Sequence, residues 1–191
     1  VDSWRSELQT DTTETPAERG EWTLFTSMAS ELLGTASTNE VLLLFFRYAS
    51  EVLNRCAIFL VKKKELVGMG QSGLQFGTEN ADERIKKVRI SLLEPSIFRQ
   101  VIERSGSHRG PLSEAQEHKQ FISQIGGTAN WPSDVFVAPL FDGKSTVAIL
   151  YGDNLPDQTP LSDTRGLEAF VKIAGVAYAK AALEKKLAER K

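Results

Sequence analysis

Two apolar runs separated by Asp142-Gly143 constrain the fold of this chain most. The runs are VFVAPLF (135–141) and STVAILY (145–151). Asp-Gly between two such runs is a strong signal for an antiparallel hairpin whose two central residues take positive φ. Because both runs are apolar at successive positions, we expect central strands that are covered on both faces of a sheet. Pro139 cannot donate to a strand ladder, so we expect a bulge or local break there.

The same stretch contains Gly143-Lys144-Ser145, the three letters with which a phosphate-binding loop ends. Such a loop has a second glycine five positions earlier and lies between a strand and a helix. Ala138 stands at that earlier position, and a β-forming run follows where the helix would begin. A nucleoside triphosphate site is therefore not expected.

Length and charge bound the class of protein. The 191 residues are enough for one domain, and the formal net charge of -2 attracts neither nucleic acid nor an anionic membrane. No apolar run approaches the roughly 20 residues that span a bilayer. A single cysteine excludes an internal disulfide framework and indicates a cytoplasmic protein. Since the sequence starts with Val1, we expect a piece of a longer polypeptide whose other domains are partners.

Hydrophobic periodicity predicts helices near both ends and strands between them. Residues 1–20 are mostly polar and predict a linker or disordered arm, followed by a single domain over 21–191. Strands clustered in hairpins with helices at the ends favour the α+β class and an antiparallel sheet. The expected helices are 21–34, 37–54 (opened by a Ser37-x-x-Glu40 capping box), 95–106, 113–122 and 162–191; the expected strands are 56–61, 65–70, 86–92 and the two runs of the hairpin; the rest of 107–134 is expected to be irregular.

The last expected helix carries two apolar stripes on different sides. We expect Ser162 to cap it and Asp163 to suit its positive end. One stripe can pack on the domain itself, and the second requires a partner, which predicts a homodimer with a coiled-coil exit. A solvated amphipathic tail is the alternative. The first stripe is Leu167, Phe170, Ala174, Ala177 and Ala181; the expected dimer interface is Val176, Leu183 and Leu187, with Trp22 from the first helix.

The reactive side chains do not form a recognisable catalytic or metal-binding pattern. The two histidines lack the ligand spacing of a zinc site, and His118 between Glu117 and Lys119 is expected to be solvated. Cys56 begins an apolar strand and is expected to be a buried, inert thiol. No set of nucleophile, base and orienting group is readable. We therefore predict neither enzymatic activity nor a cofactor.

The order of these elements, with these residues, resembles a GAF domain. The similarity covers roughly residues 21–188 and is closest to GAF-like regions of large bacterial signalling proteins. It implies a profilin-like antiparallel sheet of about six strands, with the terminal helices on one side and a small-molecule pocket on the other. The pieces that carry it are NEVLLLFFRYASEVLNRCAIFLVKKKELVGMGQSGL, PSIFRQVIERSG, VAPLFDGKSTVAILYGDN and LSDTRGLEAFVKIAGVAYAKAALEK.

Members of that family bind cyclic nucleotides, haem, bilins, amino acids or nothing. The residue set of the cyclic-nucleotide binders cannot be traced here, and one cysteine suits neither a bilin site nor the branch that reduces methionine sulfoxide. If Arg109 belongs to a binding site, it would favour a ligand with an anionic group. The alternative is that Arg109 is an ordinary surface arginine. Trp131 can close a pocket or plug the core beneath its loop. If a ligand binds, the candidates are Ser72, Ser96, His108, Arg109 and Trp131.

The resemblance implies a non-enzymatic regulatory or sensory module for signal transduction, which dimerises through its terminal helices. An unknown small molecule would bias two arrangements of those helices. The alternative is a protein-interaction or scaffolding domain that binds no ligand because its pocket has collapsed. Filling of the space beside the sheet by Phe98, Phe121, Ile125 and Trp131 would favour that alternative.

Overall fold

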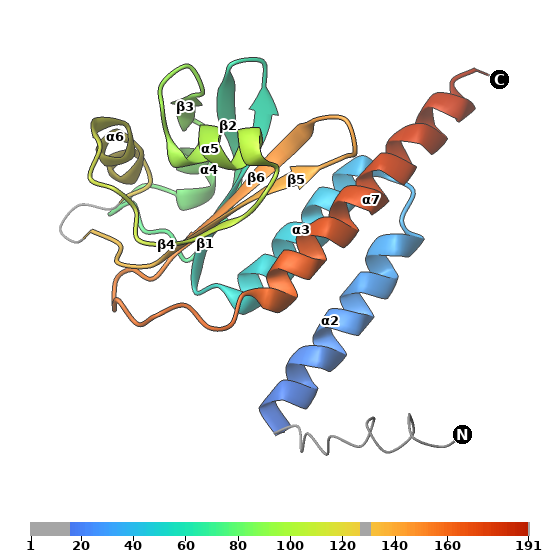
Figure 1. Cartoon of the computed structure of the whole chain (residues 1–191), viewed down its shortest axis with the longest axis horizontal. Coiled ribbons are helices and arrows are strands. Elements are labelled where there is room, and N and C mark those ends of the chain that lie inside the picture. Colours follow the sequence, from blue (N-terminus) through green and yellow to red (C-terminus); the bar gives the residue numbers. More distant parts are fainter. Residues whose placement is uncertain (1–15, 127–130, 191) are drawn as a thin grey trace, which may run out of the picture.

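A six-stranded antiparallel sheet forms the centre of the molecule (Figure 1). The computed structural model describes residues 16–126 and 131–190. The strand order is β3-β2-β1-β6-β5-β4, and every neighbouring pair is antiparallel. The predicted α+β class and antiparallel sheet are therefore confirmed. The strands are β1 (Arg55–Lys62), β2 (Glu65–Ser72), β3 (Arg89–Ser91), β4 (His108–Gly110), β5 (Val135–Phe141) and β6 (Thr146–Asp153).

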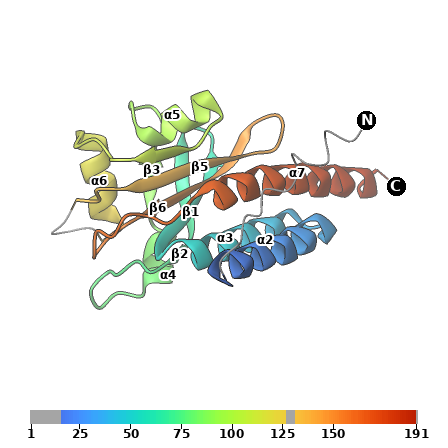
Figure 2. The ribbon, with the colours of Figure 1, turned by 60° about the horizontal axis from the view of Figure 1, so that its bottom comes forward.

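Helices cover both faces of this sheet (Figures 1 and 2). Helices α3 and α7 lie along one face, and α2 packs on α3 and α7 as an outer layer. Helices α5 and α6 lie on the opposite side, so the terminal helices share one face as the GAF resemblance implies. The helices are α2 (Pro16–Gly34), α3 (Thr38–Val52), α4 (Ala81–Ile85), α5 (Ile97–Arg104), α6 (Gln116–Gln124) and α7 (Arg165–Ala188).

The central strands are buried on both faces because alternate side chains enter two different cores. In β1, Ile58 packs against the terminal helices, whereas Ala57 and Phe59 face α5 and α6. In β5, Phe136 likewise packs against the terminal helices, and Val137 faces α5 and α6. This explains the unbroken apolar runs from which central strands were predicted.

The predicted hairpin of β5 and β6 is present, but the prediction of a two-residue turn is wrong. Phe141 pairs with Thr146, so the loop has four residues, and of these only Gly143 has a positive φ, of 88°. The Asp142 carboxylate accepts the backbone N–H groups of Lys144 and Ser145, both at 2.8 Å. Those two bonds satisfy the donors of the longer loop. The register of the β5–β6 pairing shifts between Leu140 and Phe141, one position after Pro139, where a break was expected.

Several predicted helix ends differ from the structure. Helix α2 begins at Pro16, while residues 1–15 of the predicted arm lie outside the described residues. Thr164, not Ser162, precedes α7, and Asp163 accepts the Arg165 N–H at 2.9 Å. Only half of the capping box forms: Ser37 accepts the Glu40 N–H, whereas the Glu40 carboxylate accepts the Thr35 hydroxyl.

Two short elements depart from the predicted pattern more clearly. The strand expected over 86–92 is reduced to β3, and α4 precedes it with Asn80 as its N-cap. Strand β4 lies in the stretch expected to be irregular. Both are edge strands of three residues, too short to show the alternation from which strands are predicted.

Candidate functional site

The sheet face opposite the terminal helices is filled by packed aromatic rings. Phe98 and Phe121 meet edge to face at 4.7 Å and 78°, and Phe121 meets Tyr151 at 4.7 Å and 81°. Ile125 is also fully buried, and Trp131 packs against the same cluster. The cavity that remains between β3, α5 and α6 measures about 190 Å³. Small-molecule sites usually measure ~300–1,000 Å³, so this packing favours a collapsed pocket.

Three of the five predicted ligand residues lie on this side of the sheet. Ser96 lines the 190 Å³ cavity, and its hydroxyl accepts the Arg99 N–H at 3.3 Å as the N-cap of α5. His108 in β4 stands opposite Val137, and its buried Nε2 has no hydrogen-bond partner among the described residues. The indole N–H of Trp131 donates to the Leu112 carbonyl at 2.9 Å, so this side chain packs beneath its loop.

The other two predicted residues lie on the opposite face. Arg109 stands opposite Phe136, whose side chain packs on the terminal helices. Its guanidinium donates to the Leu161 carbonyl at 2.6 Å and lies 3.6 Å from the Asp134 carboxylate. Ser72 is paired with Cys56, which belongs to the same core. Side chains alternate along a strand, so the five residues do not converge on one site.

His118 is buried, so the prediction of a solvated histidine is wrong. Its Nε2 accepts the Ile97 N–H at 3.0 Å, and its Nδ1 lies 2.9 Å from the Ser113 carbonyl oxygen. An accepting Nε2 places the ring proton on Nδ1, which then donates to Ser113. The ring joins α6 to the first turn of α5 and is a structural group.

The buried polar groups of β1 and β6 lie next to one another, although Arg55 Nε forms no hydrogen bond with a described residue. The Arg55 Nε lies 3.2 Å from Asp153 Oδ1, and the Tyr151 hydroxyl donates to Asp153 Oδ2 at 2.9 Å. Burial raises the pKa of the Asp153 carboxyl, and the Arg55 charge opposes that change. Burial and the Asp153 charge raise the pKa of the Cys56 thiol to about 12. In the part of the chain that the structure describes, no cluster of three acidic, histidine or cysteine side chains can hold a metal ion.

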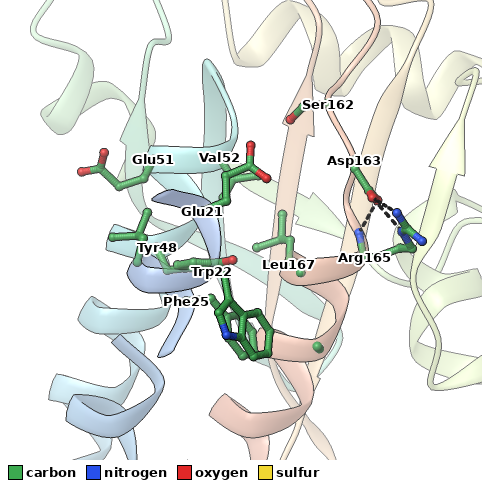
Figure 3. Close-up of a pocket in the computed structure, with 13 residues that line it drawn as sticks. Glu21, Trp22, Phe25, Tyr48, Glu51, Val52, Ser162, Asp163, Arg165 and Leu167 are labelled. Carbon is green, nitrogen blue, oxygen red and sulfur yellow. Dashed lines mark hydrogen bonds and ion pairs between the residues drawn. The ribbon is translucent and has the colours of Figure 1, made fainter. Parts of the chain in front are cut away.

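A larger cavity lies on the helical side, between α2, α3 and the start of α7 (Figure 3). We name it the helical groove; its volume is about 700 Å³, and its lining includes Trp22, Phe25, Tyr48, Glu21 and Glu51. Trp22 stacks on Phe25 at 5.3 Å, and Tyr48 stacks on Phe170 at 4.1 Å. The sequence did not predict this groove, because helical periodicity assigns Phe25 and Tyr48 to the core like any other apolar position.

The predicted interface residues lie on the surface. On α7, the outer face exposes Val176, Leu183 and Leu187 by 66%, 59% and 53%, while the opposite face packs on the domain. Trp22 on α2 is 60% exposed at the mouth of the helical groove. None of the helices within the described ranges has an apolar stretch that would cross a bilayer.

Comparison with known proteins identifies the fold. No family model and no curated protein matches the sequence. The GAF domain of a phosphoenolpyruvate-protein phosphotransferase from Coxiella burnetii has a TM-score of 0.61 at 15% identity, over 90% of this chain and 97% of that one. Residues 122 to 287 of a methyl-accepting chemotaxis protein have a TM-score of 0.61 at 14% identity. That match covers 82% of this chain and 97% of the other.

An enzyme is also among the similar structures. The free methionine-R-sulfoxide reductase from Neisseria meningitidis, in complex with its substrate, has a TM-score of 0.57 at 13% identity, over 92% of this chain and 96% of that one. At such identities the likeness concerns the fold alone. The sheet order, the terminal helices on one face and these matches together show that the chain has the fold of a GAF domain.

Proposed function

We propose that the chain is a non-enzymatic regulatory module that dimerises through α7 and transmits its signal through the terminal helices. The similar structures from a phosphotransferase and a chemotaxis protein support a regulatory role. The filled sheet face supports a module that works without a ligand in that position. The observation that carries the proposal is the exposed apolar stripe on α7.

The spacing of this stripe suits pairing with a second α7. Val176 and Leu183 are one heptad apart, and Leu187 follows four positions later, as in the a and d positions of a coiled coil. With Val176 and Leu183 as d positions and Leu187 as an a position, Lys180 occupies the intervening a position, but its ammonium donates to the Leu33 carbonyl of α2 at 2.9 Å. The lysine head is thereby held away from the stripe, which keeps the proposed seam apolar.

Thiol chemistry like that of a reductase does not fit this chain. A cysteine nucleophile acts as a thiolate and requires access to its substrate. Cys56 is fully buried, and its pKa of about 12 keeps it protonated at neutral pH. The sequence contains no other cysteine that would resolve an oxidised intermediate.

Sedimentation equilibrium tests the dimer. We expect the wild type to associate reversibly between about 5 and 200 μM. The double variant Leu183→Glu/Leu187→Glu should be monomeric with an unchanged circular dichroism spectrum. Leu93→Glu is the matched control, since Leu93 is as exposed as Leu183 (59%) but lies outside α7. A monomeric wild type, or equal disruption by Leu93→Glu, would refute the interface.

A further inference from the structure

The hydroxyl of Tyr48 is an unused polar group at the wall of the helical groove. The residue is only 4% exposed, with its ring stacked on Phe170. No described residue forms a hydrogen bond with its hydroxyl, and the oxygen is not one of the fully enclosed atoms that lack a partner, so it remains in reach of solvent. A Cβ placed on Gly166, another groove residue, would lie 3.2 Å from the oxygen. The hydroxyl is therefore available to a molecule in the groove.

The same groove has an excess of unpaired negative charge. Figure 3 shows Glu21 and Glu51 above the aromatic side chains, with the ion pair of Asp163 and Arg165 beside them. Arg165 Nε lies 2.6 Å from Asp163, which neutralises both groups. Neither glutamate has a cationic partner within the described residues. Burial, then the Glu21 charge, raises the pKa of Tyr48, so the phenol remains a neutral donor.

The aromatic side chains give the groove a surface that attracts cations. Trp22 stacks on Phe25 with nearly parallel rings, at 11°, yet remains 60% exposed. An indole face binds ammonium groups through its quadrupole. The volume of about 700 Å³ lies within the usual range of small-molecule sites.

We propose that the helical groove binds a small organic cation that also carries a hydrogen-bonding oxygen. The ammonium group lies against Trp22 and is neutralised by Glu21 and Glu51, while the oxygen bonds to the Tyr48 hydroxyl. The carboxylates repel phosphates and nucleotides from the same space. Trp22, which was expected from the sequence at the dimer interface, is assigned to this site instead. The site is therefore independent of the proposed dimer through α7, and it lies on the opposite side of the sheet from the filled aromatic face.

The charge of the groove also selects between a small cation and a second copy of the chain. Two-fold pairing through this surface would bring identical grooves together. Each copy would then present the unpaired carboxylates Glu21 and Glu51 to those of the other. Such an arrangement is repulsive, whereas a free ammonium compound compensates both carboxylates.

Choline, tetramethylammonium and 3,3-dimethylbutan-1-ol form a probe set that separates these contributions. The first carries charge and hydroxyl, the second charge alone, and the third is the uncharged isostere of choline. Titration at constant ionic strength, followed by amide and indole NMR shifts, should give saturable choline binding centred on Trp22 and Gly166. We expect the neutral alcohol to bind about tenfold more weakly. Tetramethylammonium should bind about threefold more weakly than choline.

Two sets of variants test the proposed roles of the Tyr48 hydroxyl and of the two glutamates. Tyr48→Phe should remove the advantage of choline over tetramethylammonium and leave tetramethylammonium affinity unchanged. Glu21→Gln/Glu51→Gln should weaken both cations about tenfold, given about threefold for each exposed charge. Glu65→Gln/Glu94→Gln removes the same charge from exposed positions on the sheet side, so it should have no effect.

Four results would overturn the proposal. They are equal affinity for choline and its neutral isostere, no saturation up to about 100 mM choline, equal loss in both double-glutamine variants, and choline affinity that disappears as the protein dimerises. The last would show that a second copy fills the groove. Binding that is retained in the monomeric Leu183→Glu/Leu187→Glu variant is the outcome expected of an independent site.

Discussion

At the scale of single residues, the imidazole of His118 joins two helices that are far apart in the sequence. It accepts the buried Ile97 N–H, and a protonated ring has no lone pair left to accept it. His118→Phe should lower the free energy of unfolding by about 1–3 kcal/mol, because the Ile97 donor is left unsatisfied. Urea denaturation followed by circular dichroism measures this.

The second histidine supplies the control for that substitution. His108 Nε2 is buried without a partner in the described structure, so His108→Phe removes no hydrogen bond at that atom. Its cost should be clearly smaller than that of His118→Phe. Equal costs for both variants would show that the bond to Ile97 does not stabilise the fold.

The buried thiol of Cys56 gives a prediction about pH. Its pKa rises from an ordinary 9.0 to about 12 on folding, so the folded state keeps a proton that the unfolded state releases between these values. This contribution to stability is complete below pH 9.0 and is lost towards pH 12. Cys56→Ala should show a smaller decline of unfolding free energy in that window, measured by denaturant titration. A parallel decline in both proteins would contradict the assignment.

Burial of Cys56 was predictable, and burial of His118 was not. The cysteine stands in an apolar strand, so its neighbours in the sequence define its surroundings. His118 has charged neighbours, and its decisive partner Ile97 lies 21 positions earlier. Only the packing of α6 on α5 brings the two together, and no local pattern encodes that contact.

At the scale of elements, Gly175 allows α7 to approach the β5–β6 hairpin. A Cβ there would lie 2.2 Å from the Phe141 carbonyl oxygen, so backbone must move to admit it. Gly175→Ala should lower the melting temperature, although alanine favours helices. Gly20→Ala in α2 is the matched control, since nothing lies within 4 Å of its added Cβ, and it should stabilise the protein by about 0.5–1 kcal/mol. Stabilisation by both substitutions would refute the close contact.

The elements that were predicted well are those with long hydrophobic patterns. The central hairpins and the terminal helices have apolar periodicities over many residues, and their ends alone were displaced. Edge strands β3 and β4 have only three residues each and leave no such pattern. The turn at Asp142 was longer than predicted because a side-chain carboxylate, which the turn rule does not consider, satisfies the loop donors.

At the scale of the whole molecule, the two faces of the sheet have different characters. The face beside α5 and α6 is closed by aromatic packing, while the helical side carries both the apolar stripe and the helical groove. The sequence predicted the layers of sheet and helices, because the hydrophobic periodicity of each element shows which of its faces is buried. The groove depends on how three helices meet, and Phe25 and Tyr48 reach its wall only through that packing.

The directions of α2 and α7 have a mechanical consequence. The start of α2 and the end of α7 lie at opposite ends of the helical layer (Figures 1 and 2), and Lys180 ties α7 to the Leu33 carbonyl near the end of α2. A pull or twist applied before α2 would thus travel the length of the layer before it left through α7, which is about 36 Å long at 1.5 Å per residue. Because α2 and α7 are coupled in this way, the two helices would move together and transmit a displacement from one end of the layer to the other.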